Sequence, residues 1–162
     1  MLSTPYLVGD IGEAMDKAKK LREVQQVAER LTLELATPTG LVVSAEVDEV
    51  VAPGSLGYFG VLPGHAPLPA TLGIGEVTYR IGRDEHHVAV SGGFAEVRND
   101  NVIILADAVV TPADIDRTRA ERARDRAEAR LSGRNQEEID YARAAAALAR
   151  AVTRLQVAGR GR

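Results

Sequence analysis

Residues 53 to 72 constrain the fold more than any other stretch of this chain. Glycine and proline recur there between apolar side chains, at Gly54, Gly57, Gly60 and Gly64 and at Pro53, Pro63, Pro67 and Pro69. Glycine adopts backbone angles that other residues resist, whereas proline fixes φ and lacks a backbone N–H. The pattern therefore excludes a helix or an interior strand and predicts a shaped loop held by Phe59, Val61 and Leu62. Such loops often carry contacts with other molecules, although a plain connection has the same turn chemistry.

The segment from residue 31 to residue 108 has the pattern of short β-strands. Leu31–Leu35 alternates apolar and polar residues, which is typical of a half-buried strand. After a break at residues 38–40, the pattern predicts one strand over 41–51. Further strands are expected at 75–81, 87–91, 94–97 and 102–106, with hairpin turns at 82–85 and 98–101. Many short strands at regular spacing predict an antiparallel β-sandwich or a flattened barrel.

Helical patterns flank these strands on both sides. Apolar residues at three- and four-residue steps predict a peripheral N-terminal helix over 11–31. After the strands, Thr111 and Pro112 are typical of a helix cap and first position. Two apolar stripes follow, separated by a stop at 132–135: Ala120, Ala123, Ala127 and Leu131, then Ile139, Ala142, Ala146, Ala149 and Val152. The chain is thus predicted to contain an N-terminal helical extension (1–30), a β-sandwich domain (31–111) and a C-terminal antiparallel two-helix hairpin (112–162).

The predicted hairpin is weakly held together, because alanine dominates both stripes. Burial of an alanine methyl contributes about 0.8 kcal/mol, against about 2 kcal/mol for a leucine side chain. A two-helix unit of this kind needs support from the sandwich or from a partner. The pattern fits a two-state switch and a permanently docked tail equally well.

Charge is distributed unevenly along the chain. Residues 31–111 hold ten acidic residues and three arginines, a net charge of −7, whereas residues 112–162 hold twelve arginines and eight acidic residues, a net charge of +4. An arginine-rich tail favours recognition of carboxylate or phosphate, although a solvated helix face with intrahelical ion pairs has the same composition. Interleaved charges on the tail and an acidic body argue against nucleic acid as a partner.

The sequence contains no pattern typical of an independent active site. There is no Gly-x-x-x-x-Gly-Lys-Ser/Thr loop, no Gly-x-Ser-x-Gly elbow and no cysteine. His86 and His87 are adjacent in a predicted strand, so they point to opposite faces, cannot chelate together and are expected at a solvent edge. His65 is expected to fix the loop by a hydrogen bond. We therefore expect no catalytic residue and no metal site. No apolar run approaches the roughly 20 residues of a membrane span, so we expect membrane association only through partners.

Two blocks of sequence resemble a known family. Gly60-Val-Leu-Pro-Gly-His-Ala-Pro-Leu68 is similar to the signature of the epsilon subunit of rotary F-type ATP synthases, which is called delta in mitochondria. Ser91–Val97 and Asn101–Ala106 match the second block of that family. The resemblance runs from about residue 31 to residue 155. Outside it, Tyr6–Ala14 and Lys17–Leu21 resemble the C-terminal end of the synthase beta subunit, which leaves a fusion, a start-site artefact and a genuine extension open.

The resemblance implies a non-catalytic rotor subunit that needs no cofactor and is peripheral at the cytoplasmic face of the cell membrane. The sandwich is expected to bind the gamma subunit and the ring of c subunits. The hairpin is expected to reach the catalytic alpha and beta subunits and to inhibit ATP hydrolysis. The loop residues expected at a partner interface are Tyr58, Phe59, Val61, Leu62, Gly64 and His65. A free-standing β-sandwich interaction protein is a further alternative.

The hairpin also resembles a regulatory ATP site. Residues 115–120, Ile-Asp-Arg-Thr-Arg-Ala, match the Ile/Leu-Asp-x-x-Arg-Ala motif with which some bacterial epsilon subunits bind ATP. The resemblance implies an ATP site made of Ile115, Asp116, Arg119, Ala120, Arg126, Arg150 and Arg154. Asp116 would face the adenine amino group and the arginines the polar side of the nucleotide. Val110 departs from the family, which often has an acidic residue there. Helix capping by Asp116 is the alternative, and an ATP-sensing module is the alternative function.

Overall fold

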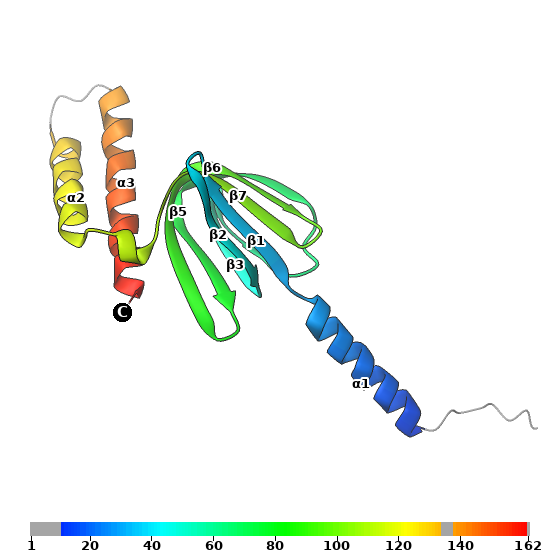
Figure 1. The fold of residues 1–162 in the computed structure, drawn as a ribbon. Coiled ribbons are helices and arrows are strands. Elements are labelled where there is room, and N and C mark those ends of the chain that lie inside the picture. Colours follow the sequence, from blue (N-terminus) through cyan, green and yellow to red (C-terminus); the bar gives the residue numbers. More distant parts are fainter. Residues whose placement is uncertain (1–10, 134–137, 162) are drawn as a thin grey trace, which may run out of the picture.

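The computed structural model describes residues 11–133 and 138–161. Its elements are α1 (Ile11–Ala28), β1 (Leu31–Thr37), β2 (Gly40–Val47), β3 (Glu49–Gly54), β4 (Gly57–Val61), β5 (Leu68–Ile81), β6 (Asp84–Arg98), β7 (Asn101–Val110), the 3-10 turn η1 (Pro112–Asp114), α2 (Arg117–Leu131) and α3 (Glu138–Arg160). The strands form one sheet in the order β2-β1-β7-β6-β5-β3-β4, which folds over into a sandwich. The helices α2 and α3 pair at one end, and α1 projects from the other (Figure 1). The expected fold class is confirmed. Among the described residues, no helix combines the length and apolarity of a membrane span.

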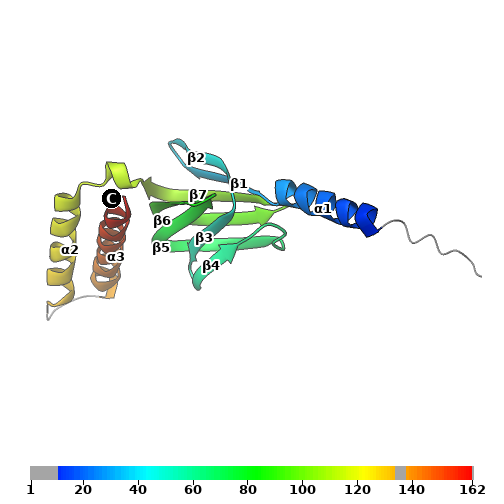
Figure 2. The same cartoon turned by 90° about the horizontal axis from the view of Figure 1, so that it is seen from below.

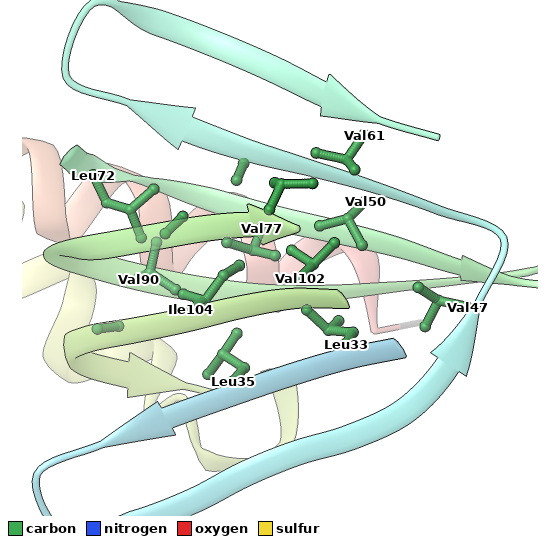
Figure 3. Packing of buried hydrophobic residues seen from close by; sticks show 14 of the residues in the cluster. Leu33, Leu35, Val47, Val50, Val61, Leu72, Val77, Val90, Val102 and Ile104 are labelled. Atoms are coloured by element: carbon green, nitrogen blue, oxygen red, sulfur yellow. The ribbon is translucent and has the colours of Figure 1, made fainter. Parts of the chain in front are cut away.

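The core lies between the two layers of the sandwich and is built from aliphatic side chains (Figure 3). In β1, Leu31, Leu33 and Leu35 are at most 1% exposed, whereas Thr32 and Glu34 face solvent. This is the alternation that the sequence predicts. Side chains from every strand contribute, among them Val47, Val50, Val61, Leu72, Val77, Val90, Val102 and Ile104. Removal of these side chains from water supplies the main driving force for folding.

One strand pair departs from a wholly antiparallel sheet. β1 and β7 run parallel, with Leu33 beside Val102 and Leu35 beside Ile104, whereas the other strand pairs are antiparallel. The parallel pair joins the first and last strands of the sandwich (Figure 2). The C-terminal helices therefore start from a strand held in the middle of the sheet.

The long strands β5 and β6 change their inward face along their length. Val88 and Val90 point inward near the start of β6, and Ala95 and Val97 point inward near its end, so the alternation shifts by one residue between them. The shift coincides with Gly92 and Gly93, whose φ angles are +68° and +113°. Such angles are open to glycine and strained for other residues. The Gly-Gly pair lets one strand serve both layers of the sandwich.

Several predicted strand limits are therefore wrong. The strand expected at 41–51 is interrupted at Asp48, whose backbone N–H donates to the Arg80 carbonyl at 2.8 Å and whose Oδ2 accepts from the Gly82 N–H at 2.6 Å. The segments expected at 75–81, 87–91 and 94–97 are parts of the longer strands β5 and β6. The two-residue hairpin turns are confirmed, and Asn99 and Asp100 have φ angles of +49° and +60°.

The glycine- and proline-rich segment is less of a loop than its composition predicts. Residues 57–61 form the edge strand β4, and residues from 68 onward belong to the interior strand β5. Pro69 is tolerated because the ladder between β3 and β5 reaches only to Leu72. At residue 69, β3 therefore needs no hydrogen bond from the N–H that proline lacks. The true loop is residues 62–67. It is pinned by the Gly64 N–H, which donates to Asp100 Oδ1 at 2.7 Å.

The first C-terminal helix starts later than expected. The prediction that Thr111 caps it is wrong, since Pro112–Asp114 form only a 3-10 turn and the Thr111 hydroxyl donates to the Asp114 carboxylate. Asp116 is the N-cap of α2, and its Oδ1 accepts from the Arg119 N–H at 2.9 Å. The capping role that the sequence offers as an alternative for Asp116 is therefore confirmed.

The helix seam follows one of the two predicted stripes. On α2, Ala120 and Ala127 are buried as expected. On α3 the prediction is wrong, because Ala142 and Val152 are exposed, whereas Ala144, Ala151, Thr153 and Val157 are buried. Asn135 and the side chain of Ile139 lie outside the described residues. The seam is nevertheless alanine-rich, so the hairpin remains a unit with little apolar contact of its own.

Candidate functional site

All seven residues of the expected ATP site line one pocket between α2 and α3. This inter-helix pocket encloses about 430 Å³. Its lining residues are Val110, Asp114, Ile115, Asp116, Arg119, Ala120, Ala123, Arg126, Ala147, Arg150 and Arg154. The sequence missed Asp114, Ala123 and Ala147, although Ala123 belongs to the predicted α2 stripe. Val110, the position that departs from the family pattern, also faces the pocket.

Four arginines converge on the inter-helix pocket from both helices. Arg119 and Arg126 lie seven residues apart on α2, and Arg150 and Arg154 lie four apart on α3. Among residues 11–133 and 138–161, none of the four takes part in an ion pair, whereas the neighbouring Arg117 pairs with Glu121. Like charges gathered close together repel one another. An anion with several oxygens would relieve that repulsion through charge-assisted hydrogen bonds.

Two carboxylates line the pocket near the start of α2. Asp114 and Asp116 lie there, one accepting from the Thr111 hydroxyl and the other from the backbone N–H of Arg119. Each of these hydrogen bonds uses one carboxylate oxygen, and a carboxylate has acceptor capacity for more than one donor. The pocket thus offers acceptors at one end and guanidinium donors along the rest.

A second candidate surface lies on the outer face of the sandwich. Cross-strand pairing places Phe94 between Leu105 and Thr71, and Glu96 between Ile103 and Pro69. These residues, with Ala70 and Ala95, line a shallow apolar groove of about 460 Å³ that we call the outer patch. Phe94 is 64% exposed, Leu105 56% and Ile103 38%. Clustered exposed apolar side chains mark interaction surfaces.

Acidic side chains flank the outer patch. Glu96 lies within it, and Glu34 on β1 is paired with Ile103 and exposed. A partner with apolar side chains between basic ones would complement this face. The sequence does not indicate the outer patch, since a strand that is apolar on both faces resembles a buried one.

The loop residues expected at a partner interface separate into two groups. Tyr58 and Leu62 are 62% and 54% exposed, and Gly64 is exposed at the tip of the loop. Val61 is fully buried and Phe59 packs against the core, so both act in packing rather than on the surface. His65 Nδ1 lies 2.6 Å from the Ala66 carbonyl, which is the loop-fixing hydrogen bond that the sequence predicts.

The loop and the helices lie at opposite ends of the sandwich. Gly64 is bonded to Asp100, which directly precedes β7, whereas the path to α2 begins after Val110 at the end of β7. Ten residues of strand span about 33 Å. A partner at the loop and a partner at the helices could therefore be bound at the same time.

Only one of the two adjacent histidines lies at a solvent edge as expected. His86 is exposed and stacks on Tyr79, with ring centroids 4.9 Å apart. The prediction is wrong for His87, whose side chain is only 11% exposed and contacts the Glu76 carboxylate through Nδ1. Burial raises the pKa of Tyr79 above its ordinary value.

Comparisons with known proteins match this chain to one family. The family model described as "ATP synthase, Delta/Epsilon chain, beta-sandwich domain" matches residues 30–112, and that described as "ATP synthase, Delta/Epsilon chain, long alpha-helix domain" matches residues 113–159. The chain is 50% identical to ATP synthase epsilon chain 2 of Syntrophotalea carbinolica over 83% of its own length and 98% of that protein. It is also 50% identical to the ATP synthase epsilon chain of Nitratidesulfovibrio vulgaris, over 80% of this chain and 96% of that protein.

The fold is shared with a chain of a solved assembly. That assembly is the Euglena gracilis mitochondrial ATP synthase, OSCP/F1/c-ring in rotational state 1, and the TM-score is 0.69 at 23% identity, covering 80% of this chain and 81% of that chain. At this identity the likeness concerns the fold.

Proposed function

Because the chain belongs to the family of ATP synthase delta and epsilon subunits, we propose that it is a non-catalytic subunit of the central stalk. In this role it couples rotation of the c-ring to ATP synthesis at sites elsewhere in the complex. It needs no cofactor and is peripheral at the cytoplasmic face of the cell membrane, held there by its partners. The working parts are the sandwich at 31–111 and the hairpin at 112–162, with residues 1–30 as an extension.

The outer patch is the observation that carries this proposal. A rotor subunit needs a firm contact with the shaft that it turns with, and the exposed Phe94, Ile103 and Leu105 offer apolar surface for it. The acidic Glu34 and Glu96 would fix the position of the shaft on this surface through charge pairing. We assign the outer patch to the gamma subunit. The loop at 62–67 is assigned to the c-ring, since it lies at the end of the sandwich opposite the helices.

The hairpin has the properties required of a reversible inhibitor. Its seam is alanine-rich, its net charge is +4, and it starts at the end of the sandwich remote from the loop. Release of the helices from the sandwich would bring a basic surface toward acidic lobes of the catalytic alpha and beta subunits. In that position it would block rotation in the direction of hydrolysis.

Gel filtration with purified gamma subunit tests the assignment of the outer patch. We expect the wild-type chain to co-elute with gamma, and Leu105→Glu to weaken binding at least tenfold, because it buries an unpaired charge in the contact. Leu56→Glu is the matched control, since Leu56 is fully exposed in the turn between β3 and β4. Equal binding by the Leu105→Glu and Leu56→Glu variants would move the gamma contact to another face.

A second function, ATP sensing, is favoured by the four arginines of the inter-helix pocket. In this proposal the adenine amino group faces Asp114 and Asp116, and the phosphates meet the guanidinium groups of Arg119, Arg126, Arg150 and Arg154. A bound nucleotide would join the two helices and favour the closed hairpin, because a ligand stabilises the state that binds it.

Titration with magnesium-free ATP tests the sensor proposal. Saturable chemical-shift changes confined to residues of the inter-helix pocket are expected, and Arg126→Gln should weaken binding about tenfold. Arg122→Gln is the matched control, because Arg122 lies one turn away on α2 and outside the pocket lining. Absence of shifts at millimolar ATP would refute sensing and would leave the rotor assignment intact.

A further inference from the structure

The helices are attached to the sandwich through the C-terminal end of α3. This helix packs against β5, β6 and η1, and Val157 near its end is fully buried. Arg160 follows in the last turn, and its Nε lies 3.7 Å from Glu76 Oε1 on β5. Within residues 11–133 and 138–161, this is the one ion pair that joins α2 or α3 to the strands.

Glu76 is held in place before Arg160 reaches it. Its side chain is 12% exposed, and the same Oε1 contacts His87 Nδ1 on the neighbouring strand. This hydrogen bond joins the Glu76 carboxylate to β6. The Glu76 backbone N–H donates to the Tyr58 hydroxyl at 3.1 Å. His87 on β6 therefore positions the carboxylate, and Tyr58 on β4 holds the Glu76 backbone. Neither contact involves the helices.

We propose that Glu76 and Arg160 form a latch that holds the hairpin on the sandwich, with His87 as the residue that positions the carboxylate. The latch is reversible because of His87. When Arg160 leaves, Glu76 keeps its hydrogen bond to His87, so release of the hairpin does not leave a buried carboxylate without a partner. The inference concerns the hairpin alone and requires neither bound nucleotide nor a partner subunit.

One side of the junction around the latch is open to solvent. A cavity of about 320 Å³ lies beside it, lined among others by Tyr79, His87, Pro112 and Arg160. On this side of the junction Arg160 contributes an ion pair in place of apolar contact. Arg160 itself is 59% exposed, which makes the ion pair accessible to salt.

Pulsed electron paramagnetic resonance on the full chain tests the latch. The sequence has no cysteine, so Leu56→Cys in the sandwich and Ala129→Cys in α2, both exposed, give one defined label pair. The ratio of released to docked hairpin is measured in urea at a concentration where the unmutated latch shows both populations. We expect Glu76→Gln and Arg160→Gln each to raise this ratio about twofold to fivefold. The double variant should match the single ones, since both remove the same interaction.

Glu85→Gln is the matched control. Glu85 is 58% exposed and lies near His87 Nε2, at 3.8 Å, without an ion pair to Arg160. Substitution of Glu85 should leave the ratio of released to docked hairpin unchanged. In the chain with unmutated Glu76 and Arg160, 1 M salt should raise this ratio. In the Arg160→Gln variant, the same salt should have little effect. Unchanged ratios in both latch variants, or fully additive effects, would overturn the proposal. Arg160→Gln keeps the test valid if Glu76→Gln disturbs the sandwich, because Arg160 is exposed at the chain end.

Discussion

At the scale of single residues, Gly93 is the glycine of the sandwich with the least room for a side chain. A Cβ built there would lie 2.1 Å from the Leu105 carbonyl oxygen, and its φ is +113°. Backbone atoms cannot move aside as a flexible side chain does. We predict that Gly93→Ala lowers the free energy of unfolding by about 3 kcal/mol or more, measured by urea denaturation.

Gly60→Ala is the control for that prediction. A Cβ at Gly60 meets nothing within 4 Å, and its φ is in a range open to other residues. Its effect should stay within about 1 kcal/mol. A Gly93→Ala variant as stable as Gly60→Ala would mean that β6 does not bend as described.

Tyr79 gives a pH-dependent prediction. Burial raises the pKa of Tyr79, so its phenol stays protonated in the folded chain at a pH where a tyrosine of ordinary pKa ionises. The resulting stability is complete below about pH 10 and is lost as pH rises through the raised value in the folded state. Absorbance at the phenolate band should show a late step that Tyr79→Phe removes. A titration in which Tyr79→Phe removes only a step near pH 10 would contradict this.

At the scale of secondary-structure elements, the start of α2 depends on one carboxylate. Asp116 caps the helix through its bond to the Arg119 N–H, so Asp116→Ala should cost about 1 kcal/mol of helix stability. Asp116→Asn should cost little, because asparagine caps equally well. Far-ultraviolet circular dichroism during urea unfolding measures both variants. An equal loss in the two would assign the effect to the charge rather than to the cap.

The elements also show what the sequence can and cannot predict. Strand β1 was predictable because Leu31, Leu33 and Leu35 alternate with polar residues. Strand β4 was not, since an edge strand forms ladder bonds on one side only and tolerates glycine that would weaken an interior strand. The buried face of α3 was missed because alanine occurs on several of its faces, so composition singles out none.

The candidate sites also differ in how far the sequence predicts them. A local motif placed Asp116 and Arg119 in the inter-helix pocket, because both lie within one helical turn. The outer patch arises from residues of three strands, and no local pattern distinguishes an exposed Leu105 from a buried one. The contact between His87 and Glu76 depends on the register of β5 against β6, which the spacing of apolar residues does not specify.

At the scale of the whole molecule, α1 is the part that stands apart. Its described side chains, among them Ile11, Met15 and Leu21, are exposed, and the family match begins only at residue 30. We predict that a chain of residues 30–162 keeps its thermal unfolding temperature and its co-elution with gamma. Loss of gamma binding on this truncation would make α1 part of the interface.

We propose this chain as a stalk subunit whose hairpin restrains ATP hydrolysis. The most direct measurement is the hydrolysis rate of the assembled synthase containing either the full chain or a chain ending at Val110, with equal incorporation verified in both. We expect several-fold faster hydrolysis with the truncated chain and retained coupling of rotation to synthesis, because the sandwich alone contacts gamma and the c-ring. An unchanged hydrolysis rate in a fully assembled enzyme would contradict the inhibitory role of the hairpin.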